Sequence, residues 1–431
     1  MREQGSGVVQ DARVTAPGDD LPEEPDHPET PLRLRGSLLA TLAALSAFGP
    51  ISLDLYLPAF PSIAESLGVS TGDVQMTFAA CLLGLGVGQL LYGPLSDRYG
   101  RKPPLIAGLI LYIVASLLCA VAPSLAVLTG LRLVQGLGGC AGLVIARAIV
   151  RDCFDGPALA RSYSVITSVA MLAPLISPTI GALVLRAVGW REVFLVIALF
   201  GAACLVGTLM LPETHPSHRR SDHGVQAALR GYGSLLRRRD FVLPGGVAAL
   251  ASGTLMAYIS SSSVVFITDY DVTPLGFALI FALMSLFFVS GVRLNLHLLQ
   301  RRTAHSLLRI YLPVIASGMA VTLVLLVVHA PLWSVLLALA VVKVCLGGTL
   351  PNATAEAMLP FARRAGAASA LLGTLQMGLG AVIAALLALL PWPPTVEMAG
   401  TMLVLSLGAS ALVALPPAAA ADPGRAAPAP A

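Results

Sequence analysis

The sequence predicts an all-α membrane protein whose twelve transmembrane helices form two pseudo-symmetric six-helix bundles. The composition, the length of the apolar stretches and the placement of the basic residues support this fold class. Of the 431 residues, 56% are hydrophobic and only 12% are charged, whereas a soluble domain carries about 25% charged residues. A soluble chain of this length could not bury so much apolar surface, so we expect lipid to cover it.

Twelve apolar stretches are long enough to cross a bilayer, which requires about 20 residues of helix. The predicted spans are residues 37–60, 74–95, 103–122, 125–149, 162–185, 191–212, 241–267, 274–299, 307–328, 331–356, 366–390 and 397–417. A long polar stretch divides them into two sets of six. The predicted organisation is a disordered cytoplasmic tail (1–36), a first bundle (37–212), a cytoplasmic linker loop (213–240), a second bundle (241–417) and a cytoplasmic tail (418–431).

The basic residues predict the orientation of the chain. Arginines and lysines precede the first span and follow each even-numbered span, and the other loops hold almost none except Arg186 and Arg191. The positive-inside rule therefore places both termini in the cytoplasm, which an even number of spans also requires. Because these residues lie between apolar spans, we assign them to topology and expect no nucleic-acid partner.

The two halves repeat one short pattern. Gly93 precedes Asp97 by four residues at the end of the second span, and Gly291 precedes Asn295 by four at the end of the eighth. This predicts an internal duplication. Two duplicated bundles are typical of transporters that rock around a site at the middle of the membrane.

Five stretches resemble a known family. The run GPLSDRYGRK from Gly93 resembles the loop motif between the second and third helices of the major facilitator superfamily. The runs LRLVQGLGG from Leu131 and APLISPTIGA from Ala173 resemble its fourth-helix and fifth-helix antiporter motifs. The run SLDLYLPAFPSIAESL from Ser52 resembles the first helix of its Bcr/CflA-type branch, as does the segment 351–381.

This resemblance covers the chain except its tails, and it implies the major facilitator fold. It also implies a drug:proton antiporter of the plasma (inner) membrane, of the kind that confers chloramphenicol or bicyclomycin resistance. Such a protein exports small amphipathic drugs by alternating access and is driven by the proton gradient. We therefore expect protons and a small-molecule drug as partners, the lipid bilayer as surroundings, no cofactor and a monomer.

Proton coupling is predicted at ionisable residues within the spans, because burying charge at membrane depth is costly. Asp54 in the first span and Arg132 in the fourth lie at the same predicted depth, so they can pair if their faces converge. Gln135 lies one turn beyond Arg132 and can share its face. We expect Asp54 to carry the proton; the alternative is a buried ion pair that only fixes helix packing. The polar cavity residues are not symmetrical between the halves, so we place coupling in the first.

Lys343 is the exception in the second half. It lies near the middle of the tenth span, too deep for its amine to reach the interface easily. It is expected to pair with Asp54, to attract an anionic or carbonyl-bearing substrate, to titrate in the cavity as a second proton site, or to serve packing only. Further candidates for the substrate cavity are aromatic, methionine and glutamine residues, which adapt to varied ligands. They are Tyr56, Phe60, Met76, Phe78, Met171, Met256, Tyr258, Phe266 and Gln376.

The loop motif predicts a cytoplasmic gate, which we name the clasp. Its residues are Gly93, Asp97, Arg98, Gly100, Arg101 and Lys102. Gly93 is expected to permit a tight turn. Asp97 is expected to bind Arg101 or a helix N-terminus, where a carboxylate is favoured. The resemblance implies that this helix belongs to the other bundle and starts near Gly366. The clasp would then lock the outward-facing state; the alternative is a topology determinant only.

The fifth span contains a predicted pivot. Pro174 and Pro178 remove backbone donors and bend the helix, and Gly181 with other small residues allows a close bundle contact.

Two rival functions remain open at this stage. One is a transporter of another kind, which exports an endogenous metabolite or an amino acid. The other is a membrane receptor or enzyme, although the sequence has no HExxH, GxSxG or P-loop motif, and the cysteines are scattered without a CxxC pattern. We expect no enzymatic activity and no metal site.

Overall fold

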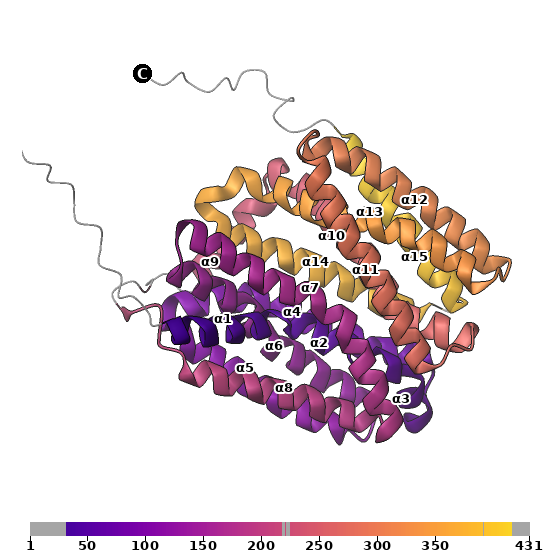
Figure 1. The fold of residues 1–431 in the computed structure, drawn as a ribbon, viewed down its shortest axis with the longest axis horizontal. Helices are drawn as coiled ribbons and strands as arrows, with labels where there is room; N and C mark the ends of the chain where they lie inside the picture. Colours follow the sequence, from indigo (N-terminus) through magenta and orange to yellow (C-terminus); the bar gives the residue numbers. More distant parts are fainter. Residues whose placement is uncertain (1–31, 218–219, 221–224, 391, 416–431) are drawn as a thin grey trace, which may run out of the picture.

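The computed structural model describes residues 32–217, 220, 225–390 and 392–415. The predicted tails, 1–36 and 418–431, lie almost wholly outside these residues. Within the described part the chain is helical and has no strand. Twelve of its helices are long and apolar enough to cross a membrane, six on each side of the linker. The two bundles lie against each other along their length (Figure 1), and the predicted fold class is confirmed.

The first bundle contains six spans, of which the first is broken into short helices. That span consists of α1 (Leu32–Ser46), α2 (Phe48–Asp54), the 3₁₀ turn η1 (Leu57–Ala59) and α3 (Phe60–Leu67). The other five spans are α4 (Thr71–Tyr99), α5 (Lys102–Ala120), α6 (Leu125–Cys153), α7 (Gly156–Ala187) and α8 (Trp190–Met210).

The second bundle repeats this count. Its first span also changes helix type, from α10 (Arg239–Ser263) to the π-helical η3 (Val264–Asp269). The other spans are α11 (Pro274–Leu298), α12 (Ala304–Val327), α13 (Leu332–Met358) with η4 (Leu359–Arg364), α14 (Ala365–Leu389) and α15 (Pro394–Ala414).

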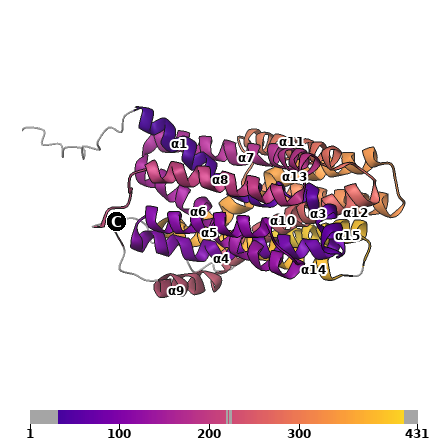
Figure 2. The ribbon, with the colours of Figure 1, turned by 90° about the horizontal axis from the view of Figure 1, so that it is seen from below.

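The linker is not only a loop as predicted, because it contains the helix α9 (Val225–Leu236). This helix lies at the end of the molecule where α1 begins, which we name the linker end (Figure 2). Tyr232 of α9 donates from its hydroxyl to the Leu90 carbonyl of α4, at 3.4 Å. Helix α9 also packs against α14 and so contacts both bundles.

A crossed pair of glycines brings the second and fourth spans of each bundle together. A Cβ atom at Gly84 would collide with the backbone of Leu133, and one at Gly136 with the backbone of Cys81. Such close approach requires residues without a side chain.

The second bundle has the same crossing. A Cβ atom at Gly291 would collide with the backbone of Val344, and one at Gly347 with that of Phe288. In both bundles each glycine meets the residue three positions before its partner, which supports an internal duplication. The duplication aligns Gly291 with Gly84, so the predicted alignment with Gly93 is wrong: Gly93 has no neighbour within 4 Å of an added Cβ.

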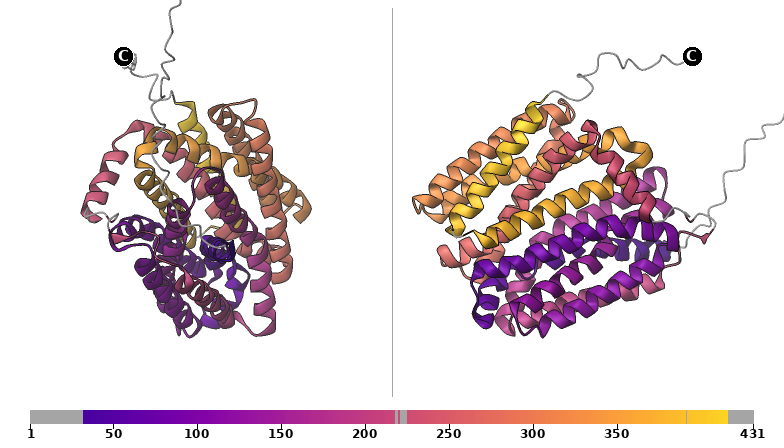
Figure 3. Two further views of the ribbon diagram at one scale, coloured as in Figure 1. Left: turned by 60° about the vertical axis from the view of Figure 1, so that its left-hand side comes forward. Right: turned by 180° about the vertical axis from the view of Figure 1, so that it is seen from behind.

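The bundles meet along α4 with α14 and along α7 with α11 (Figure 3). The Thr374 hydroxyl of α14 donates to the Gly86 carbonyl of α4 at 2.9 Å. At the end opposite the linker, η1 contacts α10 and α11, and α3 contacts η3. The broken first spans therefore join the two bundles at the opposite end.

Candidate functional site

The first span breaks at Asp54 for a reason that the sequence contains. Pro58 lies four residues later and has no N–H to donate to the Asp54 carbonyl, so α2 ends there. The chain passes through η1 and resumes as a helix at Phe60. Non-helical backbone at membrane depth is tolerated where it is buried in protein or lines a cavity. The break therefore marks the surroundings of Asp54 as a candidate site.

Asp54 is a buried carboxylate with no direct partner. It is 3% exposed, and no hydrogen bond or ion pair joins it to another side chain in the described part of the chain. The charged side chain that acts electrostatically on it is Lys343, on α13 of the other bundle. A carboxylate left without hydrogen bonds in a buried site is free to exchange a proton.

Lys343 is equally buried, at 4% exposed. Its ammonium nitrogen lies 3.4 Å from the centre of the Tyr258 ring of α10, a cation–π contact. The Tyr258 ring stacks in turn on Phe281 of α11, with centroids 6.0 Å apart. No hydrogen bond to an acceptor is found for Lys343 among the described residues, so the aromatic face is its main support.

Arg132 differs because two of its three donor nitrogens are bound, while its buried Nε has no partner in the described residues. It is fully buried and donates to the Ser52 carbonyl at 2.8 Å and to the Gln135 side chain. Gln135 donates in turn to the Ser116 hydroxyl at 2.7 Å. The Arg132 guanidinium also lies 4.1 Å from the centre of the Tyr56 ring. Arg132 and Gln135 thus form one hydrogen-bonded group, as their spacing predicts.

The pairing of Asp54 with Arg132 is not formed. Arg132 binds the backbone of Ser52, two residues before Asp54, and residues two apart point to nearly opposite sides of a helix. Equal depth in the membrane stays a prediction, and depth alone does not fix the direction in which a side chain points. No ion pair joins Asp54 to Lys343 in the described residues either; Lys343 acts on Asp54 only through the longer-range attraction of their charges.

The two buried cations occupy equivalent positions in the duplication. Arg132 precedes the crossing glycine Gly136 by four residues, and Lys343 precedes Gly347 by four. Each lies on a tyrosine from the first span of its bundle, Tyr56 or Tyr258. The predicted asymmetry of the polar residues therefore does not extend to the positions of these two cations.

The carboxylate, by contrast, has no counterpart. Asp54 precedes Tyr56 by two residues, and the residue two before Tyr258 is Met256. The asymmetry between the bundles thus lies in Asp54 and in the hydrogen bonds of the two cations.

The predicted cavity residues fall into two groups. Tyr56, Phe60 and Phe78 are fully buried, and Tyr56 is held by a 3.1 Å hydrogen bond to Thr77 and by its contact with Phe60. These contacts place it in the packed core of the first bundle. The other buried candidates lie in the second bundle and are Met256, Tyr258 and Phe266. The half-buried candidates are Met76, Met171 and Gln376.

The clasp forms the predicted ion pair. Arg101 binds Asp97 at 2.6 Å and also Asp152 of α6 at 2.7 Å. The tight turn lies at Gly100, whose φ of 92° favours glycine, and not at Gly93, which lies inside α4. Arg98 points away to solvent over the Tyr99 ring.

Glu213 completes the clasp and was not predicted. Its carboxylate accepts from the backbone N–H groups of Arg101 at 2.8 Å and Lys102 at 3.0 Å, at the start of α5. Burial alone would raise the pKa of Glu213, but these amides and that of His215 hold it below its usual range. The feature of the sequence that could have indicated Glu213 is its position directly after the sixth span, where a carboxylate can meet the positive end of a helix.

The clasp does not reach the second bundle here. Lys102 donates to the carbonyls of Leu209 and Leu211 in the first bundle. No hydrogen bond or ion pair joins Asp97 to α14 in the described residues, and nothing lies within 4 Å of an added Cβ at Gly366. The expected contact with the start of α14 is therefore absent from this conformation, in which the bundles are joined at the opposite end.

The fifth-span pivot abuts the candidate site. Helix α7 runs unbroken through Pro174 and Pro178. A Cβ atom at Gly181 would collide with the carbonyl of Leu55, the residue after Asp54. Gly181 thus lets α7 support the broken segment directly.

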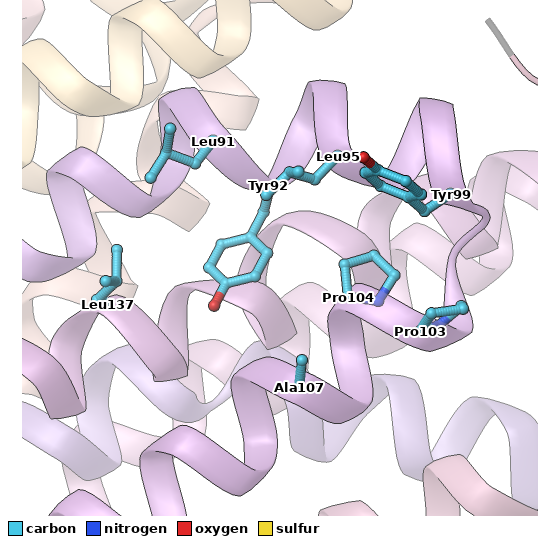
Figure 4. Close-up of a pocket in the computed structure, with 8 residues that line it drawn as sticks. All are labelled: Leu91, Tyr92, Leu95, Tyr99, Pro103, Pro104, Ala107 and Leu137. Atoms are coloured by element: carbon cyan, nitrogen blue, oxygen red, sulfur yellow. The ribbon is translucent and has the colours of Figure 1, made fainter. Parts of the chain in front are cut away.

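A separate pocket of about 550 Å³ lies between α4 and α5 near the linker end (Figure 4). Its lining is apolar apart from two tyrosines, and it contains none of the predicted cavity residues. The lining residues are Leu91, Tyr92, Leu95, Tyr99, Pro103, Pro104, Ala107 and Leu137. Because Tyr99 is half-exposed, this pocket opens on the outer surface and we assign it to lipid.

Comparisons with known proteins agree with this arrangement. Residues 39–385 match the sequence profile of the Major Facilitator Superfamily. The chain is 32% identical to the Bicyclomycin resistance protein homolog of Haemophilus influenzae over 84% of this chain and 92% of that one. It is 30% identical to Multidrug resistance protein D of Escherichia coli K12 over 82% and 89% of the two chains. A crystal structure of a D-xylose–proton symporter has the same fold, with a TM-score of 0.69 at 15% identity, covering 86% of this chain and 96% of that one.

Proposed function

The chain belongs to the major facilitator superfamily of membrane transporters, and from this premise we propose that it exports small amphipathic drugs in exchange for protons. The family and the relatives are transporters and not enzymes. Relatives named for bicyclomycin, chloramphenicol and multidrug resistance support drugs as substrates. One chain contains both bundles and the interface between them, which supports a monomer as the working unit.

The linker end is proposed to face the cytoplasm of a cell whose plasma (inner) membrane holds the protein. Arginines exposed at this end support the orientation: Arg98 and Arg151 lie in the last turns of α4 and α6, and Arg301 follows α11. The positive-inside rule places such residues on the cytoplasmic side.

Access to the site is proposed to run from the linker end in this conformation. The bundles meet at the opposite end through η1, α3 and η3. Access from the linker end is what the inward-facing state of an exporter requires.

Asp54 is the proposed proton carrier, and its lack of a hydrogen-bonding partner is the observation that carries the proposal. It lies on α2 of the first bundle, and its electrostatic partner Lys343 lies on α13 of the second. Adding a proton to Asp54 cancels an attraction between the two bundles. Because protonation and bundle separation are linked in this way, the proton gradient can drive the change from one access state to the other.

The test uses proteoliposomes that contain the purified chain and a pH-sensitive dye. Addition of chloramphenicol is expected to release protons from the wild type, and Asp54→Asn is expected to abolish the release while the protein still folds. Glu65→Gln is the matched control, since Glu65 is an exposed carboxylate on the next helix, α3. Proton release by Asp54→Asn at the wild-type rate would overturn the assignment.

A further inference from the structure

The second bundle contains a cluster of buried donors that none of its own groups satisfies. The hydroxyls of Tyr258 and Ser261 have no hydrogen-bond partner in the described part of the chain. Tyr258 is 1% exposed and Ser261 is fully buried. Lys343, which also lacks an acceptor, lies on the Tyr258 ring. Buried donors without acceptors cost free energy, so a native site that keeps three of them is expected to bind something that supplies an acceptor.

Tyr258 is a neighbour of both other donors: of Ser261 along α10, and of Lys343 through the contact on its ring. Tyr258 and Ser261 are three residues apart on α10, so their side chains share a face of the helix. Lys343 reaches the same tyrosine from α13. Because the Tyr258 hydroxyl stands at the edge of the ring that supports the ammonium group, one oxygen-bearing group can contact both.

We propose that Lys343, Tyr258 and Ser261 form a substrate subsite for an oxygen acceptor, the carbonyl of an amide-like group. This deepens the proposed function by naming the chemistry of its substrates. It places the acceptor of the substrate on the second bundle, opposite the carboxylate of Asp54 on the first. The rest of α10 supports the site, since the next segment is the π-helical η3, a geometry frequent at functional sites.

The direction of coupling restricts the substrate further. An acceptor bound to Lys343 weakens the attraction of Lys343 for Asp54, which by itself favours proton uptake together with the substrate. Exchange requires the opposite, so the substrate must also carry a donor that binds ionised Asp54 and is lost when Asp54 is protonated. An amide, or a hydroxyl beside a carbonyl, meets both requirements, whereas a plain aliphatic cation meets only the second.

The chain offers a specific reporter, because its only lysines are Lys102 and Lys343. In a Lys102→Arg variant grown with lysine carrying ¹³C at Cε, one NMR signal reports on Lys343 in the full-length protein. Benzamide and benzylamine are the probes: benzamide is neutral and carries the carbonyl acceptor, whereas benzylamine lacks the carbonyl and is a cation at neutral pH. Benzamide is expected to shift the Lys343 signal saturably, with benzylamine at least about tenfold weaker, the effect of about one hydrogen bond of 1.4 kcal/mol.

Further variants separate the subsite from a general effect. Tyr258→Phe with Ser261→Ala is expected to weaken benzamide binding about tenfold. Ser263→Ala is the matched control, because its hydroxyl is also buried and unpartnered but lies two residues after Ser261, on nearly the opposite side of α10. It should leave binding unchanged.

Equal shifts with the two probes, no saturable shift with benzamide, or equal losses in the double variant and in Ser263→Ala would each overturn the subsite. Binding is measured without transport. Failure of this test therefore leaves proton-coupled export standing, and failure of the Asp54→Asn test leaves the subsite standing.

Discussion

The two bundles hold equivalent cations against equivalent tyrosines but give these cations different partners. Arg132 is tied to Ser52 and Gln135 by hydrogen bonds, whereas Lys343 has an aromatic face and a carboxylate in the other bundle. A duplicated position has thus become structural in the first bundle and remained free in the second. Burial of a charge therefore does not indicate its role. The role depends on whether hydrogen bonds already satisfy the charged group.

The largest effect is expected when each cation is truncated, which tests the difference between the two bundles directly. Arg132→Met leaves the Ser52 carbonyl and Gln135 without their donor, so we expect a loss of about 3 kcal/mol in stability. Lys343→Met removes a buried charge without breaking a hydrogen bond, so we expect little change in stability but loss of drug transport. Thermal unfolding in detergent and transport in proteoliposomes measure the two effects. Equal destabilisation by the two substitutions would contradict the division of roles.

The next largest effect is expected at the contact between α7 and the broken span. Gly181→Leu would drive a side chain into the Leu55 carbonyl, and because the neighbour is backbone it cannot rotate away. We expect transport to fall to background through displacement of Asp54. Gly378→Leu is the control, because nothing lies within 4 Å of an added Cβ there; drug efflux from cells compares the two.

A smaller effect is expected at the clasp. Asp97 is about half-exposed in its pair with Arg101, and such a pair contributes at most about 1 kcal/mol, so Asp97→Asn should slow transport about fivefold. Ligand binding, measured by equilibrium dialysis of a radiolabelled drug, should be retained. Unchanged transport would favour the alternative that the clasp only determines topology.

The smallest effect is expected at Glu213. Its pKa is lowered in the folded chain from an ordinary 4.5, so the carboxylate stabilises the fold above that pH, and this contribution is lost as the pH falls through the lowered pKa. Glu213→Gln should therefore reduce the melting temperature slightly at pH 7, with a difference that shrinks below pH 4.5. A difference that is constant with pH would remove ionisation as its cause.

Much of the site could be predicted because its residues are exceptions within apolar spans. Asp54, Arg132 and Lys343 are conspicuous at membrane depth, and the spacing of Arg132 and Gln135 predicted their hydrogen bond. Glu213 could not be assigned in advance, because its partners are backbone amides of a loop 111 and 112 residues away. The unpartnered hydroxyls of Tyr258 and Ser261 were also beyond reach, since a missing partner is visible only when all neighbours are placed.

The twelve spans, their division into two sets and the depth of each ionisable residue could be predicted from the sequence alone. These properties follow from the length of apolar runs and from the helical rise per residue, both of which are local. Which side chains come into contact depends on the tertiary structure. The rotation of each helix about its axis is set by packing, above all at the crossed glycines of α4 with α6 and α11 with α13. For that reason Arg132 faces Ser52 and Gln135, and the charged side chain that acts on Asp54 is Lys343.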